Sequence, residues 1–597
     1  MTVRQLTFAG VTAVDEGRLR GALATRQSSR LPWGRQNVFD NARFDEDLKR
    51  ISAFYADRGY PDARVTTFDV KLNDQQDGVD VTVTVDEGTP IPVSSIDFVD
   101  FGVLPPDRTA SLRERTPLTV GAPRDREHVT ATLELAVAEL REHGYPYATV
   151  SASESGGTSG REAELVFTAV PGVLARFGAV EIVGQQSVGE QVIRRKLGYR
   201  AGELYRRSLV QDSQRTLYGL ELFQFVNIEI VDPEKQEPEV RTRVTVVEGR
   251  HQRVNFGVGY GTEDKARVQG DYRHVNFLGG ARTAGVQGRW SSLDRGLRAT
   301  FNQPYVFAPH FSAGLEGQLW RTVTPAYESR VAGGRTTLTH QANPRSAWAL
   351  SFGSEYTSSS VAESALNDPT LVDDLIALGL DPTTGRQEGT LTGFAFDINH
   401  STTNSLLDAR RGYQVGVHIE AAGSLLPGTF DFTSVSFDAR HFLPMGERFV
   451  VATRLQAGNI NPKADDPGNV PFSKKYLLGG STSIRGWGRY EVSPLGGEGT
   501  PIGGNSMLAF TSELRATVWN SLGGVLFIDG GNVWADDWSI TLDELRYAVG
   551  VGLRYTTPVG PIRLDWGYQL NPIEGLLVDG ERQSRPWRVH FSIGQAF

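Results

Sequence analysis

The sequence predicts three small α+β domains followed by an all-β domain, a transmembrane β-barrel of sixteen antiparallel strands. The N-terminal part repeats itself, the part after residue 250 follows a strand period, and the last strand has an apolar outer row. In that strand Val589, Phe591, Ile593 and Phe597 share one face, which suits a strand whose outer side contacts lipid. Nine of the ten tryptophans follow residue 250, as aromatic belts at a membrane surface would produce, although an ordinary β-rich core is the alternative.

The first 250 residues contain three copies of one pattern. The segment 59–65, Gly-Tyr-Pro-Asp-Ala-Arg-Val, recurs at 144–150 as Gly-Tyr-Pro-Tyr-Ala-Thr-Val, and a looser copy lies at 222–228. An amphipathic helix is expected before each copy, and a strand is expected to open and to close each unit. The order β-α-α-β-β predicts domains at 1–90, 91–172 and 173–250. The expected helices are 44–58, 126–143 and 209–219, and the expected opening strands are 3–8, 93–99 and 177–183.

The predicted barrel domain, 251–597, alternates apolar residues with small or polar ones. Val549, Val551 and Leu553, for example, alternate with Gly550 and Gly552. Other inward positions carry charges, which a wet lumen can hold and a dry sandwich core cannot, although a large soluble β domain is the alternative. Closure into a barrel would satisfy every backbone polar group in lipid. Strands are expected to begin near residues 252, 266, 283, 294, 313, 330, 346, 388, 411, 430, 448, 506, 523, 546, 561 and 587.

The composition excludes several kinds of site and partner. The chain has no cysteine, so it forms neither disulfides nor thiolate metal sites. A net charge of −9 gives no reason to expect a nucleic acid partner. The sequence contains no P-loop, dinucleotide fingerprint or G-x-S-x-G, and its histidines are scattered, so we expect no enzyme, cofactor or metal. Residues 1–4 lack a signal-peptide pattern, so we expect that a leader has been removed.

Two connections between the expected strands are long, and the second carries the most specific motif. The first, about 358–387, contains a possible short helix at 371–378, and the second runs from about 458 to 505. The second includes Ile484, Arg485, Gly486 and Trp487 in succession, which resembles the (V/I)RG(F/Y) signature of the BamA/TamA family of outer-membrane assembly proteins. Trp487 departs from the Phe or Tyr that is usual there. A chance Arg-Gly pair in a surface loop is the alternative.

Two further matches favour the same family. Phe527, Asp529 and Gly531 fit its F-x-D-x-G pattern on strand thirteen, and Glu513 falls where strand twelve carries an acidic residue. The resemblance implies that the loop tucks into the lumen, where Arg485 meets Glu513 and Asp529. A guanidinium keeps its charge and presents a fork of donors to carboxylates. The N-terminal units resemble POTRA domains, and three of them before sixteen strands is the layout of the TamA branch.

The resemblance implies an assembly factor in a Gram-negative-type outer membrane, with its POTRA domains in the periplasm. We expect it to insert β-barrel or autotransporter clients by pairing their strands with a weak seam between its own first and last strands. The expected partners are the bilayer, these unfolded clients and a TamB-like periplasmic protein, with no homo-oligomer. A two-partner-secretion pore for an exoprotein is the alternative. The expected seam residues are Phe256, Gly257, Gly259, Phe591, Gly594 and Phe597.

Overall fold

The chain divides into two compact units, and each is described by itself. The first comprises 1–185 and 196–247, and the second comprises 186–195 and 248–597. The computed structural model describes residues 1–29, 36–72, 78–156, 161–366, 368–405, 408–424, 426–519, 521–557, 560–578 and 580–593. Two of the expected seam residues, Gly594 and Phe597, therefore lie outside the described residues.

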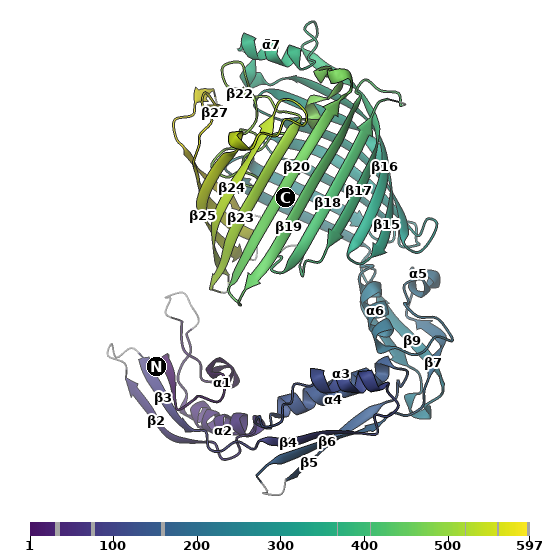
Figure 1. Cartoon of the computed structure of the whole chain (residues 1–597), viewed down its shortest axis with the longest axis vertical. Coiled ribbons are helices and arrows are strands. Elements are labelled where there is room, and N and C mark those ends of the chain that lie inside the picture. Colours follow the sequence, from purple (N-terminus) through teal and green to yellow (C-terminus); the bar gives the residue numbers. More distant parts are fainter. Residues whose placement is uncertain are drawn as a thin grey trace. The chain divides into compact units, whose positions relative to one another are not determined.

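Each N-terminal repeat folds as a three-stranded sheet with two helices, in the predicted β-α-α-β-β order. The closing strand is central in every sheet (Figure 1). In the first two repeats it runs parallel to the opening strand and antiparallel to the strand that precedes it in the chain. None of the helices within the described ranges is long and apolar enough to cross a membrane. The elements are β1 Thr2–Ala9, α1 Glu16–Ala22, α2 Asn41–Asp57, β2 Arg64–Leu72 and β3 Gly78–Asp86; β4 Val93–Val99, α3 Pro106–Arg115, α4 Arg126–Glu142, β5 Thr149–Gly156 and β6 Ala163–Val170; β7 Arg176–Val183, α5 Glu190–Arg194, α6 Arg207–Tyr218, β8 Phe223–Ile230 and β9 Glu239–Glu248.

The sequence of α2 explains both its start and its buried face. Asp40 caps the helix by accepting a hydrogen bond from the backbone N–H of Arg43. Phe44, Ile51 and Tyr55 recur at helical spacing and are buried against the sheet of the first repeat. The amphipathic pattern of this segment therefore predicts the helix and the side that it packs.

A carboxylate fixes the loop after the opening strand in two of the three repeats. Glu87 accepts hydrogen bonds from the backbone N–H groups of Thr12 and Ala13, both at 2.9 Å. Glu248 stands at the matching place in the third repeat and accepts from the backbone N–H groups of 186–188. Pro171 occupies that place in the second repeat and has no such acceptor. The turns after the closing strands look alike in sequence, but only those with a glutamate bind the loop after the opening strand.

The second unit contains a closed sixteen-stranded antiparallel barrel, as predicted. Every strand begins within three residues of the predicted position. β16 and β20 extend to Val361 and Pro462, so both long connections begin later than the sequence indicates. The strands are β10 Gln252–Gly261, β11 Lys265–His274, β12 Thr283–Trp290, β13 Asp294–Pro304, β14 Phe311–Val323, β15 Tyr327–Asn343, β16 Ser346–Val361, β17 Arg386–Ser401, β18 Gly412–Ala422, β19 Phe432–Met445, β20 Phe449–Pro462, β23 Ser506–Trp519, β24 Leu522–Trp534, β25 Arg546–Thr557, β26 Gly560–Gln569 and β29 Trp587–Ile593.

The two long connections pack together at one end of the barrel. The first forms α7, Pro369–Ala377, close to the expected 371–378 (Figure 1). Leu371 and Leu375 of α7 are buried in one apolar cluster with Phe472 of the second connection. Within the second connection, residues 495–496 (β21) and 500–501 (β22) form a small hairpin beside α7. These loops cover the end of the barrel to which they belong.

Candidate functional site

The second long connection, 463–505, lies partly inside the barrel. Its Arg485 is 2% exposed, and the flanking Ile484 and Trp487 are fully buried. Two isolated backbone bridges, Tyr476 with Gly504 and Leu478 with Val492, hold the returning limbs of this loop together. The tip of the loop is thereby presented to the inner barrel wall.

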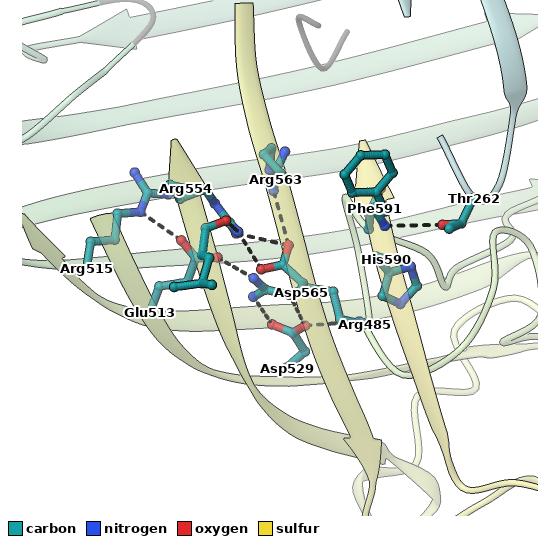
Figure 2. Close-up of polar contacts among 12 residues, drawn as sticks. Thr262, Arg485, Glu513, Arg515, Asp529, Arg554, Arg563, Asp565, His590 and Phe591 are labelled. Atoms are coloured by element: carbon teal, nitrogen blue, oxygen red, sulfur yellow. Dashed lines mark hydrogen bonds and ion pairs between the residues drawn. The ribbon is translucent and has the colours of Figure 1, made fainter. Parts of the chain in front are cut away.

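Arg485 contacts both of the carboxylates that the family resemblance implies for it, Glu513 and Asp529. Its Nε and Nη2 donate to Asp529 Oδ2 and Oδ1 at 2.7 and 2.8 Å, and its Nη1 donates to Glu513 Oε1 at 2.6 Å (Figure 2). The backbone N–H of Arg485 also donates to Asp529, at 3.0 Å. The guanidinium carbon lies 3.5 Å from the ring centroid of Phe527, so the aromatic of the F-x-D-x-G pattern forms the floor of this site.

Charges of alternating sign surround this contact. Arg515 Nε donates to the other oxygen of Glu513 at 2.7 Å. On β26, Asp565 accepts from Arg554 Nη2 at 3.0 Å (Figure 2). Each of these buried carboxylates is therefore paired with a hydrogen-bonded guanidinium, and none of the three is a free acid or base. Within the described ranges, His, Asp and Glu form no group of three or more placed to hold a metal ion.

The glycine of the motif permits a close approach between the loop and the wall. Gly486 has a φ of +102°, which few other residues adopt. On β26, a Cβ at Gly567 would lie 2.6 Å from the nitrogen of Gly486, so a side chain there would displace the loop. The carbonyl of Gly486 accepts from Gln569 Nε2 at 2.6 Å, and its N–H donates to His590 Nε2 at 3.1 Å. Sequence reasoning places Gln569 and His590 on inward faces without giving them partners.

Glu263, in the hairpin between β10 and β11, is a further residue that sequence reasoning missed. It accepts from His590 Nδ1 and from the backbone N–H of Ser481, both at 2.8 Å. Burial acts to raise the pKa of the Glu263 carboxyl, but the contacts with His590 and Ser481 leave that pKa below its usual value. No sequence motif marks this turn residue, because its partners lie more than two hundred positions away along the chain.

Trp487 lies in a buried apolar cluster that includes barrel-wall residues. Ala509, Val533 and Ala548, on three adjacent strands, belong to this cluster together with loop residues. Small wall residues leave room for an indole where the family pattern has a smaller aromatic. Among the described residues, Trp487 Nε1 has no hydrogen-bond partner although it is buried.

The junction between the first and last barrel strands is described only as far as Ile593, because 594–597 lie outside the described residues. β10 pairs with β29 at Tyr260–Ile593 and Gly261–Ser592, whereas β29 pairs with β26 along 562–568. Across the junction, the N–H of Thr262 donates to the carbonyl of Phe591 at 3.1 Å, and the N–H of Phe591 donates to Thr262 Oγ1 at 3.4 Å (Figure 2). Arg267 Nη2 donates to the carbonyl of Ile593 at 3.1 Å.

The other expected seam residues lie on the part of β10 that precedes these pairs or beside them. Phe256 is 72% exposed on the outer face, and Gly257 pairs with Gln269 of β11. A Cβ at Gly259 would lie 2.7 Å from the carbonyl oxygen of Ile593, so this glycine permits close approach of the last strand. Within the described residues, 252–259 have strand partners on β11 alone.

Comparisons with known proteins agree with this architecture. The model described as the Omp85 superfamily domain matches 276–597, and the POTRA model, described as a surface antigen variable number repeat, matches 1–88 and 175–249. The outer membrane protein assembly factor BamA of Neisseria meningitidis is 22% identical, covering 95% of this chain and 76% of the relative. BamA of Nitratidesulfovibrio vulgaris is 24% identical, covering 100% and 73%.

A solved structure shares the fold. The crystal structure of Haemophilus ducreyi BamA lacking POTRA domains 1–3 superposes with a TM-score of 0.64 at 17% identity, covering 84% of this chain and 99% of that one. Because the superfamily model spans more than half of the sequence, and the closed barrel with its POTRA repeats agrees with it, this chain belongs to the Omp85 superfamily.

Proposed function

We propose that this protein is an outer-membrane protein assembly factor, with its barrel in the outer membrane and its POTRA repeats in the periplasm. The superfamily match and the two BamA relatives support this assignment. The observation that carries the mechanism is the junction of β10 with β29, the first and last strands of the closed barrel, which pair at two positions among the described residues. We infer that a client strand enters at this junction.

The physical basis is the cost of unpaired backbone groups in hydrocarbon. An incoming client strand brings N–H and C=O groups that cost several kcal/mol each if they stay unpaired. When β10 separates from β29 it exposes such groups as well, and a client strand that adds to this edge satisfies both sets. The barrel then acts as a template, and the reaction is an exchange of hydrogen bonds without covalent chemistry.

We assign Ile484, Arg485, Gly486 and Trp487 the role of a latch that holds the loop inside the barrel. The ion pairs of Arg485 with Glu513 and Asp529, its contact with Phe527, and the burial of Trp487 support this role. In the same pattern Gly531 allows close strand approach, since a Cβ there would lie 2.5 Å from the carbonyl oxygen of Leu508.

The identity of the clients and of the periplasmic partner is also part of this proposal. Unfolded β-barrel or autotransporter proteins are the proposed clients, and a TamB-like protein is the proposed periplasmic partner. The TamA-like subtype is the finer part of this proposal, and the relatives named above are BamA proteins. A secretion pore is the alternative function. With the inserted loop in the lumen we expect low conductance in planar bilayers, and a large steady conductance would favour the pore.

A single disulfide across the seam tests the proposal. Since the chain has no cysteine, Tyr260→Cys with Ile593→Cys introduces one unique pair at partnered positions. We expect the oxidised barrel to lose client insertion in proteoliposomes and to regain it on reduction. The control is Ile398→Cys with Val417→Cys, partnered positions on β17 and β18. If the oxidised seam variant inserts clients as well as the control does, the seam is not the working region.

A further inference from the structure

The inserted loop contacts both sides of the seam. On the side of the last strand, the N–H of Gly486 donates to His590, and Arg588 Nη1 donates to Glu491 Oε1 of the loop at 2.6 Å. On the side of the first hairpin, Glu263 accepts from the N–H of Ser481 in the same loop. The Arg485 contacts with β23 and β24 belong to another part of the wall. The loop therefore has a second set of anchors, at the seam itself.

His590 and Glu263 also contact each other across the seam. His590 Nδ1 lies 2.8 Å from Glu263 Oε1, and His590 is 3% exposed. Because the N–H of Gly486 points at Nε2, that nitrogen must accept, and the proton of a neutral imidazole then lies on Nδ1 and is donated to Glu263. This assignment satisfies every hydrogen bond in the chain Gly486–His590–Glu263–Ser481, and its alternative tautomer satisfies neither contact of the ring.

Two further charged pairs hold the loop, one to β13 and one to the last strand. Arg489 of the loop lies 3.1 Å from Asp294, which begins β13. Glu491, which holds Arg588 of the last strand, also accepts from the N–H of Gly488 at 2.6 Å, so its position is fixed within the loop. The loop segment 481–491 thus includes anchors to the last strand, to the first hairpin and to β13. The described β10–β29 pairs join the strand that carries His590 to the strand that precedes Glu263.

We propose that His590 and Glu263 form a clasp that couples the inserted loop to the seam. The seam then opens only when the hydrogen bonds of these two residues with Gly486, Ser481 and each other break. Both are positioning residues, because they act on the pairing of β10 with β29 and would not themselves contact a client. The proposal deepens the assembly function above and rests on it only in treating the seam as the region that opens. Side-chain contacts through the loop add to the backbone pairs that join the two strands among the described residues.

The test measures seam opening separately from client insertion. His590→Phe removes both ring contacts at similar volume, and Glu263→Leu removes the acceptor. Glu263→Gln keeps an oxygen that can accept from both partners. The matched control is His418→Phe, since His418 Nδ1 makes a like contact of 2.7 Å with Asp397 between β17 and β18, which pair along 393–401. Each variant is purified as the full chain in detergent, and heat-modified gel mobility checks that the barrel is closed and folded.

Two readouts follow the seam. Hydrogen–deuterium exchange of 588–593 should be about tenfold faster in His590→Phe and Glu263→Leu, as expected for the loss of one hydrogen bond to a charged group. The Tyr260→Cys/Ile593→Cys disulfide should form several-fold more slowly in the same variants, because cross-linking needs the two strands close together. Glu263→Gln and His418→Phe should match the parent in both readouts.

The outcomes separate the clasp from the proposed function. Parent-like exchange and cross-linking in His590→Phe and Glu263→Leu would overturn the clasp, and so would an equal rise along β17 and β18, which would mean general loosening. If His590→Phe does not fold, Glu263→Leu against Glu263→Gln decides the same question. A seam that loosens while client insertion stays at the parental rate would support the clasp and count against the seam as the site of insertion.

Discussion

Replacing Arg485 by alanine removes the cation that two buried carboxylates share. Asp529 would lose both of its side-chain hydrogen bonds from Arg485 and keep only the one from the backbone N–H. Glu513 would lose the bond at 2.6 Å but keep Arg515 as a partner. Asp529, which is fully buried, is therefore the group that suffers most.

The expected cost is that of leaving one member of a buried ion pair without its partner. Such a loss is worth roughly 3–5 kcal/mol, which corresponds to roughly a hundredfold to a thousandfold or more in the folding equilibrium. The side chains of Arg485 and Asp529 are 3% and 0% exposed, so solvent screening reduces this value little. The contact between the guanidinium and the Phe527 ring is lost as well.

The assay is urea unfolding of the purified barrel in detergent, followed by gel mobility and by tryptophan fluorescence. Arg515→Ala is the control, and it should cost less than about 1 kcal/mol because Arg515 is 40% exposed. Adding Asp529→Asn to Arg485→Ala should recover part of the loss, since a neutral amide needs no cation. A loss below about 1 kcal/mol for Arg485→Ala, or no recovery in the double variant, would refute the reasoning.

Three further predictions concern packing and pH. Trp487→Phe should change barrel stability by less than about 1.5 kcal/mol, because lost packing is offset by removing an unpaired buried N–H, whereas Trp487→Ala should cost about 3–5 kcal/mol in urea unfolding. Gly567→Ala should destabilise the barrel by about 1–3 kcal/mol in the same assay, unlike Gly270→Ala, whose Cβ would meet open space. Burial raises the pKa of Glu87, but its hydrogen bonds leave the pKa below the unfolded value of 4.5. The stabilisation by Glu87 is therefore present above that pH and lost as pH falls through the lower folded pKa. The measurement is amide exchange of the loop after β1, corrected for intrinsic rates. In the parent the exchange rate should rise as pH falls through the folded pKa of Glu87. No such rise should occur in Glu87→Gln or in the matching loop of the repeat that has Pro171.

The sequence was most informative where a short period determines the structure. Alternation by two residues predicts each barrel strand, because every second side chain faces lipid and the others face the lumen. The same alternation places Asp529, Gln569 and His590 on inward faces. It does not predict which of them meet, because that depends on the register between strands that are distant along the chain.

The remaining site residues carry no local signal. Glu263 is a turn residue whose function arises only when a loop far along the chain folds back onto it. Gly567 resembles the other glycines of the barrel strands, and its close approach to Gly486 is visible only in three dimensions. The difference between Glu87 and Pro171 could be predicted, since the aligned turns show that one repeat lacks the carboxylate.

The covering loops join the outer surface to the interior of the barrel. Asp374 of α7 accepts from the N–H of Gly497 at 2.7 Å, and Asp368 beside it accepts from that of Glu498 at 3.0 Å. These two nitrogens belong to the same loop that carries Arg485 into the lumen. A protein that bound α7 from the extracellular side would therefore act on the loop that carries the latch. It would restrain the movement of that loop without entering the lumen.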